Sequence, residues 1–131
     1  MRREALLAAS DWVILCVDDE ALPLTLRTLV LQKQGYQVKT ALSVADALQV
    51  LDTSHVDLVL TDQLMAGGTG TELAAKIKRT RPDLPVILIS GVNEMPADMT
   101  PIDLFISKVE GPVAMCEKIA GVLAQSSRGQ K

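Results

Sequence analysis

The sequence has little of what nucleic-acid-binding proteins need. Its aromatic residues are Trp12, Tyr36 and Phe105, which are too few to form a platform on which bases stack. Lys and Arg total 13 against 16 Asp and Glu, so the chain carries a formal charge of -3 and has no basic excess to hold a phosphate backbone. We therefore expect no direct nucleic-acid partner.

Cysteines and long apolar runs are scarce as well. Cys16 and Cys116 have neither the close spacing of a metal site nor the density of a secreted disulfide scaffold, which favours free thiols in a reducing compartment. The apolar stretch Ala5–Ala9 is too short for the core of a signal peptide or for a bilayer span. We expect a cytoplasmic protein that makes no contact with a membrane.

The length of the chain limits it to one domain. Its 131 residues, 48% of them hydrophobic, suit one compact unit with a single core. We place this domain at residues 12–125, between an N-terminal tail or linker of residues 1–11 and a C-terminal tail of residues 126–131.

Short β-branched runs alternate with longer amphipathic runs along the chain, which is typical of βαβ units in a parallel sheet. The central runs are apolar almost throughout, as strands covered by helices on both faces must be. We predict five strands, at Val13–Asp18, Val38–Ala41, Asp57–Asp62, Pro85–Ser90 and Leu104–Ser107.

The amphipathic runs predict helices over about residues 22–33, after Ser43, and over about 71–79 and 112–124. Ser43 with Asp46 resembles a capping box. Between the fourth and fifth strands, Pro96 and Pro101 confine any helix to about Met95–Met99. We therefore expect a fourth helix shortened to about one turn.

The candidate functional side chains stand at the carboxyl ends of predicted strands. They are Asp18 and Asp19 after the first strand, Asp62 at the end of the third, Ser90 at the end of the fourth and Lys108 after the fifth. In an open α/β sheet of order 2-1-3-4-5 these ends share one edge, and a ligand crevice forms there where the strand order reverses. Three carboxylates, a hydroxyl and an ammonium are therefore predicted to converge.

Three carboxylates in one cleft require a cation. Two carboxylates about 5 Å apart repel each other by roughly 3 kcal/mol at an effective dielectric constant near 20. Oxygen ligands from few residues, with no cysteine or histidine placed to join them, suit Mg²⁺ better than zinc. Beside such an ion, a carboxylate can attack phosphorus and form an acyl phosphate.

Four segments resemble, in order and spacing, the signature segments of response-regulator receiver domains of bacterial two-component signalling. They are V-D-D-E, V-D-L-V-L-T-D-Q-L-M ahead of a glycine loop, V-I-L-I-S-G and F-I-S-K. The resemblance covers about residues 13–123 and implies a flavodoxin-like, doubly wound parallel sheet. It implies a signalling switch rather than an enzyme, phosphorylated by a histidine kinase or a histidine phosphotransfer protein. A free-standing receiver and one taken from a hybrid histidine kinase both fit it.

The resemblance also implies roles for the clustered residues. Asp62 takes the place of the phosphoryl acceptor and of a metal ligand. Asp19 and the main-chain carbonyl of Leu64 take the places of direct Mg²⁺ ligands, and Asp18 that of a ligand acting through water. Lys108 takes the place of the cation that pairs with the acceptor and then with its phosphate.

Two further positions resemble the switch residues of the family, and two depart from its pattern. Ser90 takes the place of the hydroxyl that moves toward the phosphoryl oxygens, and Phe105 that of the aromatic switch. Ala66 and Val109 stand where the family usually has proline, and the second of these prolines commonly fixes the lysine loop. Relatives also dimerise through the helix that is shortened here, so we expect a monomer or a weak dimer.

Each clustered residue has a plainer interpretation when it is taken alone. The aspartates at the end of the first strand favour the positive end of a helix, Asp62 and Ser90 suit turns, and Lys108 suits a solvated surface. These interpretations give no reason for all of them to share one edge of the sheet. The glycine-rich stretch Gly67–Thr71 lacks the lysine of a phosphate-binding loop, and we expect it to be a flexible turn.

Two other functions stay open on the sequence alone. A metal-dependent phosphohydrolase with an aspartyl nucleophile would need a second acid near Asp62, where Gln63 and Leu64 stand, and usually a cap domain. A non-phosphorylated pseudo-receiver used for docking would be expected to have lost one of the reactive groups, and none is missing.

Overall fold

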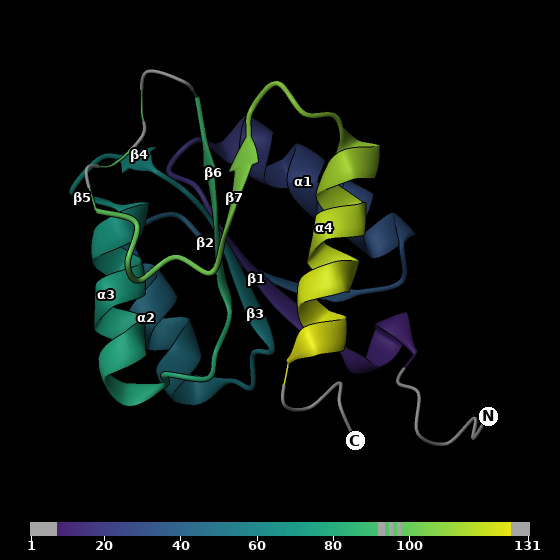
Figure 1. The fold of residues 1–131 in the computed structure, drawn as a ribbon, viewed down its shortest axis with the longest axis horizontal. Helices are drawn as coiled ribbons and strands as arrows, with labels where there is room; N and C mark the ends of the chain where they lie inside the picture. The colour runs from purple at the N-terminus through teal and green to yellow at the C-terminus, as the bar shows by residue number, and fades with distance from the viewer. Residues whose placement is uncertain (1–7, 92–93, 95, 97, 127–131) are drawn as a thin grey trace.

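The computed structural model describes residues 8–91, 94, 96 and 98–126, and its centre is a five-stranded parallel sheet (Figure 1). The sheet order is β2-β1-β3-β6-β7, which confirms the predicted 2-1-3-4-5 order. The strands are β1 (Val13–Val17), β2 (Gln37–Ala41), β3 (Leu58–Asp62), β6 (Val86–Ser90) and β7 (Leu104–Ser107).

Helices cover both faces of the sheet, as the apolar central strands predict. They are α1 (Ala21–Lys33), α2 (Val44–Thr53), α3 (Gly70–Thr80) and α4 (Pro112–Gln125). α1 and α4 lie on one face, and α2 and α3 lie on the other (Figure 1). Strand side chains alternate between the two hydrophobic clusters, so that Ile14 of β1 packs with α1 and α4 whereas Leu15 packs with α2 and α3.

Local sequence signals fix the helix ends. The side chain of Ser43 accepts a hydrogen bond from the Asp46 N–H at 3.0 Å, so the predicted cap of α2 is confirmed. At the start of α3, Thr69 and Glu72 form a reciprocal capping box. After α1, Gly35 has a φ of 100°, a left-handed conformation that glycine adopts without steric cost.

The chain between β6 and β7 departs further from a helix than expected. Of the segment predicted to form one helical turn, Pro96, Asp98 and Met99 are not helical, and residues 95 and 97 lie outside the described residues. Glu94 lies in a 3-10 turn. The two prolines of this segment explain the outcome, since neither can continue a helix that has already begun.

Three short elements were not predicted. The stretch expected to be a flexible turn instead contains the antiparallel pair β4 (Leu64–Met65) and β5 (Gly68–Thr69), and Gly67 turns between them with a φ of 81°. Within the segment expected to be an N-terminal tail, Ala9–Asp11 form a 3-10 helix. None of the helices in the described part of the chain is long and apolar enough to cross a lipid bilayer.

Candidate functional site

The predicted side chains gather at the carboxyl edge of the sheet. Asp18 directly follows β1, and Asp62 and Ser90 end the neighbouring strands β3 and β6. Lys108 follows β7, and its Nζ lies 3.1 Å from Oδ1 of Asp62. The acceptor candidate and the lysine therefore form the ion pair that the sequence predicts.

Asp62 is a buried carboxylate, with 4% of its surface exposed. Lys108 lies at ion-pair distance from its Oδ1 but without the geometry of a hydrogen bond, and within the described residues this buried oxygen has no hydrogen-bond partner. Burial raises the pKa of Asp62. The charge of Lys108 opposes this shift, the charge of Asp18 adds to it and that of Arg27 opposes it. Oδ1 of Asp62 is thus a buried oxygen that faces two cations, Lys108 and Arg27, without a hydrogen bond from either in the described residues.

The two aspartates after β1 have different environments. Asp18 is buried, and its Oδ1 accepts a hydrogen bond from the Glu20 N–H at 2.9 Å. Asp19 is partly exposed, and its Oδ2 accepts a hydrogen bond from the Ala66 N–H at 2.8 Å. This second bond ties the end of β1 to the β4–β5 turn.

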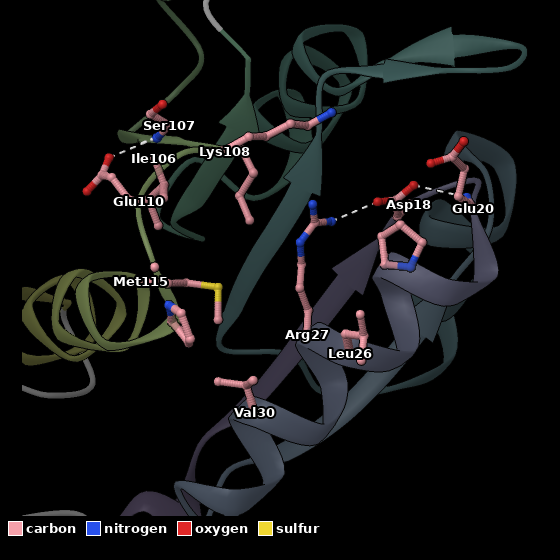
Figure 2. Close-up of a pocket in the computed structure, with 14 residues that line it drawn as sticks. Asp18, Glu20, Leu26, Arg27, Val30, Ile106, Ser107, Lys108, Glu110 and Met115 are labelled. Carbon is pink, nitrogen blue, oxygen red and sulfur yellow. Dashed lines mark hydrogen bonds and ion pairs between the residues drawn. The ribbon is translucent and has the colours of Figure 1, made fainter.

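Arg27 is a member of the site that the sequence analysis missed. Its Nη1 lies 2.8 Å from Oδ2 of Asp18, and its Nη2 lies 3.9 Å from Oδ1 of Asp62. Figure 2 shows the side chain reaching from α1 toward Asp18. One feature of the sequence could have identified it. Arg27 comes four residues after Pro23 and three before Val30, so the three residues share one face of α1.

Glu94 is the second member that was missed. Its Oε1 lies 3.1 Å from Nζ of Lys108 and accepts a hydrogen bond from the Gly91 N–H, also at 3.1 Å. Burial lowers the pKa of Lys108, but the carboxylates of Glu94 and Asp62 outweigh this effect and leave the pKa above its ordinary value. Lys108 therefore stays a cation that is shared by two carboxylates.

The predicted switch residues lie on the neighbouring strands. Ser90 is fully buried, and its hydroxyl donates to the carbonyl of Gly91 at 3.2 Å. Phe105 is partly exposed on β7, in register with Leu88 of β6. Leu64, whose carbonyl the resemblance assigns to the metal, begins β4 two residues after Asp62.

Gln63 occupies the place where a phosphohydrolase would need its second acid. Its Oε1 accepts hydrogen bonds from the N–H and the hydroxyl of Thr71, at 3.0 and 2.7 Å. Gln63 is buried, so its amide serves to hold the start of α3 beside the site. This neutral, structural use of Gln63 argues against the phosphohydrolase alternative.

The carboxylates suit a hard cation, although they do not surround one as they stand. In the described residues, no three side chains of Asp, Glu, His or Cys are grouped closely enough to hold a metal ion. The reason is visible in the contacts, because Arg27 lies between Asp18 and Asp62, and Asp19 is held by Ala66. Oδ1 of Asp62, which no described residue hydrogen-bonds, and the all-oxygen donor set still fit Mg²⁺.

A cleft of about 360 Å³ adjoins these groups between α1 and α4 (Figure 2). Its lining combines apolar side chains, among them Val30, Ile106 and Met115, with charged groups of the site such as Arg27 and Lys108. The site therefore opens onto a cleft whose lining is apolar in one part and charged in another.

Comparisons with known proteins agree with this geometry. The family described as response regulator receiver domain matches residues 14–120. The transcriptional regulatory protein GlrR of Escherichia coli K12 is 35% identical over 118 residues, which make up 87% of this chain and 27% of that protein. The sensor histidine kinase RcsC of the same strain is 42% identical over 77 residues, 59% of this chain and 8% of that protein. The chain thus spans about a quarter or less of the length of these relatives.

Solved structures of response regulators are similar to this chain as well. The response regulator TrrA of Thermotoga maritima, in complex with Mg²⁺-BeF, has a TM-score of 0.80 at 29% identity, covering 85% of this chain and 98% of that one. In the complex of TrrA with the histidine kinase ThkA, the TM-score is 0.79 at 29% identity, covering 86% and 98%. With five parallel strands in the same order and an aspartate cluster at their carboxyl edge, the chain belongs to the response regulator receiver domain family of two-component signalling.

Proposed function

We propose that this receiver domain accepts a phosphoryl group on Asp62, with Mg²⁺ as its cofactor. The observation that carries the proposal is the buried Asp62 carboxylate, which is paired with Lys108 and keeps one oxygen without a hydrogen-bond partner in the described residues. A carboxylate that is held at the edge of the sheet beside a lysine can act as the nucleophile toward phosphorus. Lys108 then balances the charge that the phosphoryl oxygens bring.

The other residues of the edge support this step. Asp18, Asp19, Asp62 and the carbonyl of Leu64 would hold Mg²⁺, which supplies charge neutralisation to the incoming phosphoryl group. Ser90 is close enough to the acceptor strand to turn its hydroxyl from Gly91 toward a phosphoryl oxygen, since β6 pairs directly with β3. Phe105 on the next strand is the aromatic side chain that would follow this movement.

The phosphoryl donor would be a histidine kinase or a histidine phosphotransfer protein acting in the cytoplasm. An apolar surface suited to such a partner lies beside the site, where Leu22, Leu26 and Leu29 of α1 are 54 to 68% exposed. Val109 and Val113, which are 87 and 73% exposed, extend it across the loop after β7 and the start of α4. The complex of TrrA with ThkA is a precedent for a receiver bound to a kinase.

The proposal is tested with acetyl phosphate as a small donor and intact-mass spectrometry as the readout. The wild-type chain should gain the mass of one phosphoryl group when Mg²⁺ is present and none when the metal is chelated. Asp62→Asn should gain none under either condition. Asp52→Asn, which makes the same change on the exposed side of α2, should behave as the wild type. Equal phosphorylation of the Asp62→Asn variant would refute the assignment of the acceptor.

A further inference from the structure

Arg27 is a residue of the site whose position opposes the binding of a metal. Its guanidinium contacts two of the carboxylates proposed to hold Mg²⁺, at 2.8 Å from Asp18 and 3.9 Å from Asp62. All three side chains are largely withdrawn from solvent, with exposed fractions of 17% for Arg27, 4% for Asp18 and 5% for Asp62. Interactions between charges are screened weakly at such depth.

We propose that Arg27 is an internal counter-cation that competes with Mg²⁺ for Asp18 and Asp62, and so sets the metal concentration at which the domain becomes competent for phosphorylation. This inference rests on the proposed function, because it concerns the affinity of the same metal site.

The competition follows from the hydrogen bonds of Asp18. Its Oδ1 accepts from the Glu20 N–H and its Oδ2 from Arg27, so both oxygens are engaged. A metal ion, or a water bound to it, reaches Oδ2 only if the guanidinium withdraws. Whatever free energy Arg27 contributes to the pair is then subtracted from the binding of the metal.

No other described cation replaces Arg27 at Asp18. The ion pairs of Lys108 are with Asp62 and Glu94 and not with Asp18. Without Arg27, and without a metal, the charge of Asp18 would act on the neighbouring charge of Asp62 with no described cation in an ion pair with Asp18. Arg27 therefore balances the charge of these carboxylates while no metal is bound.

The cleft beside Arg27 has room for its side chain in a second conformation. The cleft between α1 and α4 is lined by both Arg27 and Glu20, so a displaced guanidinium has open space beside the site to enter (Figure 2). An arginine side chain has enough rotatable bonds to move there without any shift of α1. Binding of the metal then requires a change of rotamer rather than a rearrangement of the fold.

The first test measures Mg²⁺ binding by isothermal titration calorimetry on the wild type, Arg27→Gln and a matched control, Arg79→Gln. Arg79 is exposed near the end of α3, so the control makes the same chemical change away from the carboxylates. Arg27→Gln should bind Mg²⁺ about tenfold more tightly, in the range of ordinary coupling between sites. Arg79→Gln should change the affinity less than about twofold at physiological ionic strength.

The second test separates competition from a purely structural role. In EDTA, Arg27→Gln should melt at a lower temperature than the wild type, and saturating Mg²⁺ should remove the difference. An arginine that only packs α1 would lower the melting temperature equally in both conditions, which would overturn the inference. If Arg27→Gln folds in neither condition, Arg27→Lys is measured instead. We expect Arg27→Lys to bind Mg²⁺ more tightly than the wild type, because a lysine lacks the planar guanidinium that contacts both carboxylates.

The outcomes distinguish this inference from the proposed function. If the wild type and Arg27→Gln bind Mg²⁺ equally, Arg27 does not compete and the inference fails while the metal site stands. If neither protein binds Mg²⁺, both the proposed function and the inference about Arg27 are refuted. Tighter binding by Arg27→Gln, with rescue of its stability by the metal, supports both.

Discussion

At the scale of single residues, Gly70 lies tightly against the backbone of the acceptor residue Asp62. A Cβ at this position would collide with the carbonyl oxygen of Asp62 and would lie 2.8 Å from Cδ1 of Leu88. We expect Gly70→Ala to lower the free energy of unfolding by about 2 kcal/mol, the usual cost of overpacking a core. Gly121→Ala, at an open position in α4, should instead stabilise the protein by roughly 0.5 to 1 kcal/mol. Urea denaturation measures both, and a Gly70→Ala variant as stable as the wild type would contradict the packing argument.

Cys16 gives a prediction about pH and reactivity. Burial raises the pKa of its thiol to about 12, and the charge of Arg27 only partly opposes this. Because the folded-state pKa lies above the ordinary thiol value of 9.0, the unfolded chain loses this proton first, and stability should decline as the pH rises from about 9 toward 12. Near neutral pH, iodoacetamide should label the partly exposed Cys116 before Cys16, as peptide mass mapping of the labelled protein can show. Labelling of Cys16 ahead of Cys116 in the folded protein would contradict this burial.

The site residues that the sequence identified are those at strand ends. The alternation of strands and helices fixes where a parallel strand ends, so the positions of Asp18, Asp62 and Lys108 followed from it. Arg27 and Glu94 were missed because they come from a helix and from an irregular segment. Their contribution depends on how far a side chain reaches across the edge, which spacing along the chain does not specify.

At the scale of elements, Glu110 holds the loop that carries Lys108, although Val109 replaces the usual proline. Its Oε2 accepts a hydrogen bond from the Ser107 N–H at 2.9 Å, and its Oε1 lies 2.7 Å from Nζ of Lys118 on α4. The carboxylate thus joins the end of β7 to the last helix, as Figure 2 shows for Ser107. The contacts of this side chain therefore restrain a loop in which Val109 follows Lys108.

We therefore expect Glu110→Ala to loosen this loop and to slow phosphorylation severalfold, because Lys108 would be positioned less well against Asp62. Hydrogen exchange at the Ser107 amide, which would lose its acceptor, should become faster. Glu117→Ala removes the same charge from an exposed position on α4 and should leave both measurements near the wild type. Unchanged exchange at Ser107 in Glu110→Ala would show that the backbone alone fixes the loop.

Elements with a periodic pattern were predicted well, and short elements were not. The five strands lie within about one residue of the predicted bounds, and Ser43 caps α2 as expected. The pair β4–β5 escaped prediction because each strand has two residues, which is too short for any periodicity. The 3-10 helix at Ala9–Asp11 depends on tertiary contact, since the carbonyl of Ser10 accepts a hydrogen bond from the side chain of Gln37 at 2.7 Å.

At the scale of the whole molecule, the exposed apolar side chains are concentrated on one side. Of the large hydrophobic residues exposed in the described part of the chain, most belong to α1 or to the region from the loop after β7 into α4. The segment between β6 and β7 contributes none of them among its described residues. The surface that we assign to the phosphoryl donor thus also carries most of the exposed large hydrophobic side chains of the described residues.

This distribution predicts the oligomeric state after activation. Dimerisation through the chain between β6 and β7 needs a helix with an exposed apolar face, and the described residues there form no α-helix. We expect sedimentation velocity to show a monomer both without and with beryllofluoride and Mg²⁺, or at most a weak dimer. Any association that is seen should respond to Val113→Asp, which places a charge on the exposed start of α4, rather than to Ile102→Asp. A tight beryllofluoride-dependent dimer that Ile102→Asp abolishes, while Val113→Asp leaves it intact, would show that this segment forms an interface despite its irregular backbone.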